Sequence, residues 1–258
     1  MKTAVVFTCS HCDPQIPNDR FDWLGELIYD VKPDYVVDLG DGADLKSLNS
    51  YDTKYPKSIV AQNYEADINC YNDAQDRLRH KFRVMKKKRP AFFGLEGNHE
   101  HRLKRALSLD PRLEGSKYGI SFSHLQTNGW FDEYHEYKNS APAIFNKDGI
   151  SYAHYIASGN YGTAMSGIHH AYGLVQKRYS STTVGHSHKR SIFFKDDANP
   201  HPAIGLVAGC FKGAEESWAG QSNLDWWKGV IIKRNIQDGY YEPEFVSLKR
   251  LRDVYGKS

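Results

Sequence analysis

Apolar residues recur along the chain in two patterns, as short runs bounded by polar residues or glycine and as longer stretches with helical spacing. Short runs rich in β-branched and aromatic residues predict buried strands, whereas spacings of three and four predict helices. The runs predict strands at residues 4–7, 35–37, 91–95 and 181–184. The helical spacings predict helices at residues 22–30, 64–85, 102–107 and 163–178. Strands that alternate with helices in this way indicate an α/β protein.

The second half of the chain adds a different arrangement. Residues 143–145 and 150–153 flank an Asp148-Gly149 pair, which predicts a β-hairpin. Short apolar runs at residues 191–194, 203–208, 229–233 and 243–247 predict further strands, which we expect to form a second, antiparallel sheet. Residues 110–128 show no clear period and predict an irregular region with some helix. Because no internal repeat or linker is visible, residues 1–258 are predicted to form a single domain.

Composition narrows the class of protein. With 258 residues and 40% hydrophobic residues the chain can bury a full core. Its net charge of +3 is too small to indicate a nucleic-acid binder, although residues 86–89 form a basic run. No apolar stretch approaches the ~20 residues that span a bilayer, and no secretory signal follows Met1, so we expect a cytoplasmic protein. Four cysteines are too few for a disulfide framework.

Polar side chains that can bind metal or carry a proton follow the predicted strands. They are His11, Asp41, Asn98, His154, His186 and His188. In an open α/β sheet such strand ends converge on one crevice. Imidazole, carboxylate and amide oxygen together suit Zn, Mn or Fe rather than Mg or Ca alone, and one aspartate can bridge two ions. Two ions about 3.5–4 Å apart can clamp an in-line displacement at phosphorus. The pattern therefore predicts a dinuclear metal centre for phosphoryl chemistry.

The same segments resemble the motifs of calcineurin-like metallophosphoesterases, which are D-x-H, G-D-x-x-D, G-N-H-[DE], a lone histidine after a strand, and G-H-x-H. In that order the chain carries Cys9-Ser10-His11, Gly40-Asp41-Gly42-Ala43-Asp44, Gly97-Asn98-His99-Glu100, His154 and Gly185-His186-Ser187-His188. The match spans roughly residues 4–190, and the joint pattern is far more specific than any one motif. With its tryptophan-rich segment 218–227, the chain is similar to the small enzymes of this family that are common in bacteriophages and bacteria.

The resemblance implies a four-layer αββα sandwich and a metal-dependent phosphoric ester hydrolase that uses two divalent ions, Mn, Zn or Fe. One ion would be held by His11, Asp41, His188 and the residue at position 9, and the other by Asp41, Asn98, His154 and His186. His99 would protonate the leaving oxygen, supported by Asp44. Phosphodiester substrates (nucleotide or nucleic acid) are favoured over phosphomonoesters or phosphoproteins. Loops at residues 49–62 and 110–135 are candidates for selecting the substrate.

Cys9 departs from the family pattern, because an aspartate normally stands at this position. A thiolate is a softer ligand that favours zinc, so Cys9 as a ligand would alter the metal preference of the first site. Two other interpretations stay open: Cys9 is a small buried filler, or the carboxylate of Asp13 takes its place. A redox couple with Cys12 is disfavoured, because such couples usually open a helix, whereas Pro14 and Pro17 follow here.

The alternative function is a binding module that keeps the scaffold but has lost turnover through Cys9. Retention of His99 argues against it, since a pure scaffold needs no proton donor. Arg102, Lys189 and Arg190 lie close to the motifs and could meet phosphate charge, although exposed basic side chains are more often ordinary surface. The remaining histidines match no motif and are predicted to be structural or exposed; they are His80, His101, His124, His135, His169, His170 and His201.

Overall fold

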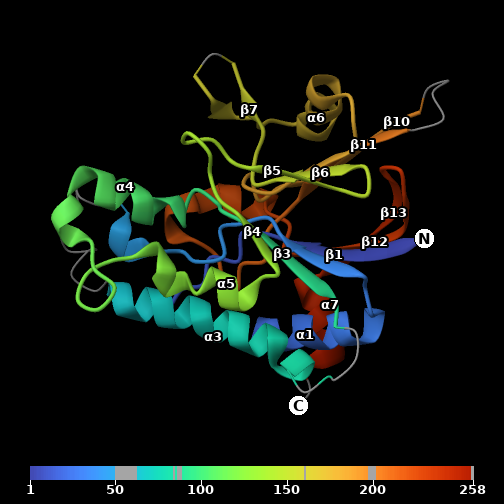
Figure 1. Cartoon of the computed structure of the whole chain (residues 1–258). Helices are drawn as coiled ribbons and strands as arrows, with labels where there is room; N and C mark the ends of the chain where they lie inside the picture. The colour runs from blue at the N-terminus through green and yellow to red at the C-terminus, as the bar shows by residue number, and fades with distance from the viewer. Residues whose placement is uncertain (50–62, 84, 86–88, 160, 197–201, 257–258) are drawn as a thin grey trace.

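The computed structural model describes residues 1–49, 63–83, 85, 89–159, 161–196 and 202–256, which form two large β-sheets with helices on their outer faces (Figure 1). The first sheet has the strand order β13-β12-β1-β2-β3-β4, and the second has the order β10-β11-β9-β6-β5. The strands of the first sheet are β1 Lys2–Phe7, β2 Tyr35–Asp38, β3 Ala91–Leu95, β4 Glu133–His135, β12 Gly229–Gln237 and β13 Tyr240–Ser247. Those of the second are β5 Ile144–Lys147, β6 Ile150–Ala153, β9 Thr182–Val184, β10 Arg190–Lys195 and β11 Ala203–Ala208.

Three buried clusters define the layers. Alternate residues of β1 point to opposite faces, so Val5 and Phe7 pack against the helices while Val6 packs between the two sheets. The helices on the outer face of the first sheet are α1 Asp19–Val31, α3 Tyr64–Arg83 and α7 Leu248–Tyr255. Helix α6, His170–Arg178, covers the second sheet, where Leu174 packs against Val207. The predicted four-layer αββα sandwich is therefore confirmed, as Figure 1 shows.

Shorter elements complete the described chain. They are helices α4 His101–Leu109 and α5 Thr127–Trp130, the 3₁₀ segments η1 Lys46–Leu48, η3 Pro111–Leu113, η4 Phe122–Leu125 and η5 Ser217–Asp225, and a small hairpin of β7 Ala157–Ser158 with β8 Thr163–Ala164. The irregular region predicted at residues 110–128 is confirmed, since it contains η3, η4 and the start of α5. Residues 50–62, most of the first candidate substrate loop, and residues 86–88 of the basic run lie outside the described residues. Among the described helices, none is both long and apolar enough to cross a bilayer.

The predicted boundaries of two helices are wrong. The helix predicted from residue 163 begins at His170, because residues 163–164 form β8 and Gly167 adopts φ +99°, a conformation that interrupts a helix. Ile168, expected on its buried face, is 87% exposed. The helix predicted to reach Met85 ends at Arg83.

The predicted separate sheet of tail strands is also wrong. Strands β10 and β11 join β9 in the second sheet, with β11 parallel to β9, whereas β12 and β13 extend the first sheet beside β1. Alternation of apolar residues shows which face of a strand is buried, but it does not show which neighbour the strand pairs with. The hairpin of β5 and β6 is confirmed, with Asp148 and Gly149 alone in its turn.

Candidate metal centre

The predicted site residues lie on loops that follow five strands. His11 follows β1, Asp41 and Asp44 follow β2, Asn98 and His99 follow β3, His154 follows β6, and His186 and His188 follow β9. Strands β1, β2 and β3 are parallel neighbours in one sheet, and β6 and β9 are parallel neighbours in the other. Their carboxyl ends therefore meet at one rim of the sandwich, which is why residues far apart in sequence gather there.

One half of the cluster is formed by His154, His186, Asn98 and Asp41. The Asn98 Oδ1 atom lies 3.0 Å from His154 Nε2 and 2.8 Å from His186 Nδ1. His154 Nε2 also lies 3.2 Å from His186 Nδ1 and 3.1 Å from Asp41 Oδ2. Four potential ligand atoms thus converge on one small volume.

The hydrogen bond made by Nδ1 of His154 determines the state of its other ring nitrogen, Nε2, which faces this volume. His154 Nδ1 donates to the carbonyl oxygen of Leu39 at 2.9 Å, so in the neutral ring Nε2 carries a lone pair. That lone pair faces a carboxylate oxygen of Asp41 and an amide oxygen of Asn98, which are both acceptors. Acceptors that face acceptors in a buried site need a positive charge between them, either a proton or a cation. The donor set therefore fits a metal ion.

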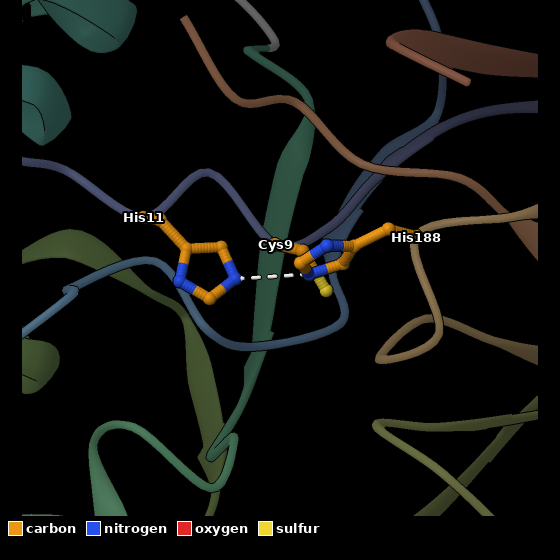
Figure 2. A group of neighbouring side chains, drawn as sticks. All are labelled: Cys9, His11 and His188. Carbon is orange, nitrogen blue, oxygen red and sulfur yellow. Dashed lines mark hydrogen bonds between the residues drawn. The ribbon is translucent and has the colours of Figure 1, made fainter. Parts of the chain in front are cut away.

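The other half is formed by His11, His188 and Cys9. The two Nε2 atoms of the histidines lie 3.1 Å apart, and Figure 2 shows the rings pointing toward each other with the Cys9 sulfur beside His188. His11 Nδ1 is 3.2 Å from a carboxylate oxygen of Asp44. The ring proton of His11 therefore sits on Nδ1 and points away from His188. The Nε2 lone pair of His11 is thereby left for a ligand in the centre.

Asp41 and Cys9 link the two halves. The Asp41 Oδ2 atom is 3.9 Å from His11 Nε2 and 3.1 Å from His154 Nε2. Among the described residues, the ligand atoms of Cys9 lie within 4.8 Å of those of His11 and His188 and, in a second group, of Asp41 and His154. The Cys9 sulfur also accepts a hydrogen bond from the backbone N–H of His186 at 3.1 Å. Cys9 thus lies between the two halves of the cluster.

Asp13, the other candidate for the first site, is bound by other partners. Its carboxylate accepts from Lys46 Nζ at 2.6 Å and from the backbone N–H of Gln15 at 2.9 Å. Cys9 and Cys12 are both buried, and both are free cysteines. The geometry therefore favours Cys9 over Asp13 as the group next to His11, and no bond joins Cys9 to Cys12.

Burial keeps three of the histidines neutral. It is the largest cause that lowers the pKa of His11 to about 3, of His188 to about 2 and of His186 to about 4. Neighbouring positive charges act in the same direction. Neutral imidazoles are the form that binds metal, so these three rings are prepared as ligands at neutral pH.

Charge is concentrated on Asp41 and its partners. Burial opposes ionisation of Asp41, yet His154 and His99 hold its pKa well below the usual value. Burial also opposes charge on His154, but Asp41 raises the pKa of this ring above its ordinary value. Burial, and then the charge of Asp41, raise the pKa of the Cys9 thiol well above its usual value. The ionised carboxylate of Asp41 and the raised pKa of His154 thus depend on each other.

His99 and Asp44 lie at the edge of the cluster. His99 Nδ1 is 2.9 Å from both the backbone oxygen and a carboxylate oxygen of Asp44, so this nitrogen carries the proton. His99 Nε2 lies 3.3 Å from Arg102 Nη2, and the Arg102 guanidinium also donates to the backbone oxygen of Asp44 at 2.8 Å. Arg102 therefore stands beside the atom of His99 that would face a substrate.

The loops that hold the cluster adopt unusual backbone conformations. Five of the predicted site residues have φ between 43° and 65° although none is glycine: Cys9, His11, Asp41, His186 and His188. Each such residue costs on the order of 1–2 kcal/mol and persists only where the surroundings enforce it, typically at functional sites. Gly97 allows the loop after β3 to approach Asp41, because a Cβ atom there would lie 2.2 Å from Asp41 Oδ1.

Three residues around the cluster were not predicted. Glu100 is buried and its carboxylate accepts from the backbone N–H groups of three residues in two loops: Asp41, Ala43 and Gly97. Lys212 is buried, and its charge contributes to the low pKa of His11 and His188. The Trp226 ring stands edge-on to His188 with 4.5 Å between centroids. The motif signalled Glu100, but nothing in the local sequence places Lys212 or Trp226 at this rim.

The other candidates lie away from the centre. Lys189 pairs with Asp225 at 3.0 Å, and the Arg190 guanidinium lies over the Trp227 ring. His101 Nδ1 is 2.9 Å from Glu96, which is consistent with a structural histidine. His170 is buried next to Ser187, and burial lowers its pKa to about 4.

Comparisons with known proteins give similarity of structure only. No protein-family model matches the chain, and no curated protein matches it. Among solved structures, the chain is similar to a conserved uncharacterised protein of Streptococcus pneumoniae described as a predicted phosphoesterase. The alignment covers 96% of this chain and 90% of that chain, with 12% identity and a TM-score of 0.36. The fold of this chain is therefore assigned from its own two sheets and the helices that cover them.

Proposed function

We propose that the protein is a metal-dependent phosphoesterase that uses two divalent ions, Mn, Zn or Fe, and that residues 1–258 act as one catalytic domain. The observation that carries the proposal is the convergence of acceptor atoms around His154 Nε2, together with a second group of ligand atoms around His11 and His188. Such a donor set of imidazole, carboxylate, amide oxygen and thiol suits these ions.

In this proposal the carboxylate of Asp41 would help to hold both ions. His11, His188 and Cys9 complete one site, and Asn98, His154 and His186 complete the other. When bound, the ions would polarise a phosphoryl oxygen and supply a hydroxide nucleophile at neutral pH. Neutral His11, His186 and His188 are ready for this role without first losing a proton.

His99 is the proposed general acid, positioned by Asp44. Because its Nδ1 proton is directed at Asp44, only Nε2 can deliver a proton to a leaving oxygen. A protonated Nε2 would face the Arg102 guanidinium, and the two positive groups would repel each other. The acid role therefore requires Arg102 to pair with the phosphoryl oxygens of the substrate, which offsets the repulsion and orients the ester.

Phosphodiesters, either nucleotides or nucleic acid, are the proposed substrates ahead of phosphomonoesters. The groups beside the cluster include a buried lysine, Lys212, which pairs with Glu216, and a half-buried aromatic ring, Trp226; together they suit an anionic ester with a flat leaving group. The second candidate function, a binding module without turnover, is favoured by the raised pKa of the Cys9 thiol, which opposes a thiolate ligand. A bound cation would remove that opposition.

The deciding experiment measures the metal content of the purified protein together with its hydrolysis of bis(4-nitrophenyl) phosphate. We expect two ions per chain and metal-dependent turnover that is lost on chelation. Two bound ions without turnover of diesters or monoesters would favour the binding module, and a protein that binds no metal would overturn both assignments of the cluster.

A further inference from the structure

A cavity of about 630 Å³ lies beside the candidate metal centre. It is lined by the start of α1, by part of the segment 213–228 and by the start of α7. Three of the five tryptophans in the chain, Trp23, Trp226 and Trp227, contribute to its lining, and Leu224, which is 83% exposed, stands at its edge. A cavity of this size with an aromatic lining is typical of ligand sites.

The cavity shares a wall with the cluster. Trp226 lines the cavity and also stands edge-on to His188. Arg20, another lining residue, donates to the backbone oxygen of Ser10 at 3.1 Å and so fixes the loop that carries His11. The cluster and the cavity are therefore adjacent, with the Trp226 ring between them.

The cavity also has a positive balance of charge. Its lining includes the basic residues Arg20, Lys228, Lys249 and Arg252, against the acidic residues Asp19 and Glu215. Lys249 is paired with Asp253 at 2.6 Å, whereas Arg252 is exposed one turn from the start of α7. The cavity thus combines aromatic surface with cations that can meet phosphate groups.

We propose that this cavity is a nucleobase subsite and that the substrate is single-stranded nucleic acid, an inference that rests on the proposed function of the neighbouring cluster. Tryptophan faces stack with unpaired bases of any sequence, and surrounding basic side chains follow the phosphate backbone. Recognition of a phosphopeptide relies instead on clustered arginines, which this lining does not provide. The base next to the reacting phosphate would occupy the cavity, and the following phosphates would meet Lys228 and Arg252.

Binding is measured apart from turnover, by fluorescence anisotropy of fluorescein-labelled decathymidylate with the full chain in EDTA, where hydrolysis cannot occur. Arg252→Glu should weaken binding by about tenfold or more, because a phosphate contact becomes a repulsion. The matched control is Arg250→Glu, an exposed residue of the same helix outside the cavity, which changes net charge equally and should alter the dissociation constant by less than about twofold. Equal losses in both variants would overturn the proposal.

A second variant and a second readout guard against a folding defect. Leu224→Glu places a carboxylate at an exposed edge and should also weaken binding, with an unchanged circular dichroism spectrum. Unlabelled decathymidylate should quench tryptophan emission, because bases stack on the indole rings. A ten-base-pair duplex should bind more weakly, since its base faces are already covered. Absence of quenching, or equal binding of duplex and single strand, would show phosphate contacts without stacking and overturn the subsite.

Failure of this inference can be told apart from failure of the proposed function. If wild-type protein hydrolyses bis(4-nitrophenyl) phosphate but Arg252→Glu and Arg250→Glu bind decathymidylate equally, the phosphoesterase stands and the subsite is wrong. If decathymidylate binds through the cavity as described but no ester is hydrolysed, the subsite stands and the proposed reaction is wrong.

Discussion

Two polar clusters lie between the sheets of the sandwich, and they satisfy their charges in different ways. The candidate metal centre occupies the rim where strands end. Deeper in the same layer, Lys233 of β12 is fully buried, donates to Thr183 Oγ1 at 2.6 Å, and lies over the rings of Tyr152 and Tyr241 at 4.5 and 4.1 Å. Burial lowers the pKa of Lys233 well below its ordinary value.

The difference separates a structural cluster from a functional one. The Lys233 amine meets a hydroxyl acceptor and two aromatic faces, so the chain itself supplies its partners. At the rim, acceptor atoms of Asp41, Asn98 and His154 face one another, so the volume between them needs a positive charge. A polar cluster that its own donors satisfy serves the fold, whereas one that lacks a positive charge indicates a ligand.

The largest expected effect comes from removing the carboxylate at the centre of the rim cluster. Asp41→Asn should lower turnover by about 10³-fold or more, equivalent to about 4 kcal/mol of transition-state stabilisation, and should release metal from both sites with the fold intact. Metal stoichiometry by mass spectrometry, with circular dichroism as the control for folding, tests this. Two tightly bound ions in the variant would remove the assignment of Asp41.

Loss of the proposed acid should affect turnover but not metal content. His99→Ala should lower turnover by about 10²–10⁴-fold without releasing metal, because the ring donates a proton but binds no ion in this assignment. The loss should be smaller for a nitrophenolate leaving group, which needs no proton, than for an alkoxide. Equal losses for the two leaving groups would show that His99 is not the acid.

Cys9 should set the metal preference of the rim cluster without being essential for metal binding. Cys9→Asp restores a hard oxygen ligand and should raise affinity for manganese by about tenfold, with a higher manganese-dependent rate. Aspartate also tolerates the left-handed backbone at this position better than most residues, so the fold should accept it. Metal stoichiometry and rate are compared for wild type, Cys9→Ser and Cys9→Asp. Indistinguishable values would identify Cys9 as a buried filler.

The effect expected at Lys233 does not reach the metal centre and concerns stability alone. Replacing the amine and its acceptor together, Lys233→Met with Thr183→Val, should stabilise the protein at pH 7 by about 1–3 kcal/mol without changing metal content. Because the folded-state pKa lies below the ordinary value of 10.5, stability in the wild type is lost as pH falls from that value toward the folded pKa.

The wild type should therefore gain stability relative to this double variant between pH 7 and pH 9.5, by at most about 1.4 kcal/mol per pH unit. Urea unfolding at several pH values measures the gain. A constant difference across that range would mean that Lys233 is protonated in the folded protein, held by the faces of Tyr152 and Tyr241.

Much of the fold followed from local patterns. The apolar runs predicted β1, β2, β3 and β9, and the Asp148-Gly149 turn predicted the β5–β6 hairpin, because side-chain alternation and turn chemistry act over a few residues. The start of α6 was predicted wrongly because the helical spacing of apolar residues continues across Gly162 and Gly167. The positive φ angles of these two glycines nevertheless interrupt the helix. Helix α7 was not predicted, since it covers a sheet edge that only the pairing of β12 and β13 creates.

By itself, the sequence determined which residues form the candidate centre, because each chemical group directly follows an apolar strand and carries its motif with it. Tertiary structure alone decided that Cys9 rather than Asp13 stands beside His11, and that Lys212 and Trp226 enclose the same rim. It also decided the placement of Lys233 between the sheets, which depends on β12 pairing with β1 across more than two hundred residues of sequence. Pairings of this kind are set by the burial of the complete sandwich, and no local pattern encodes them.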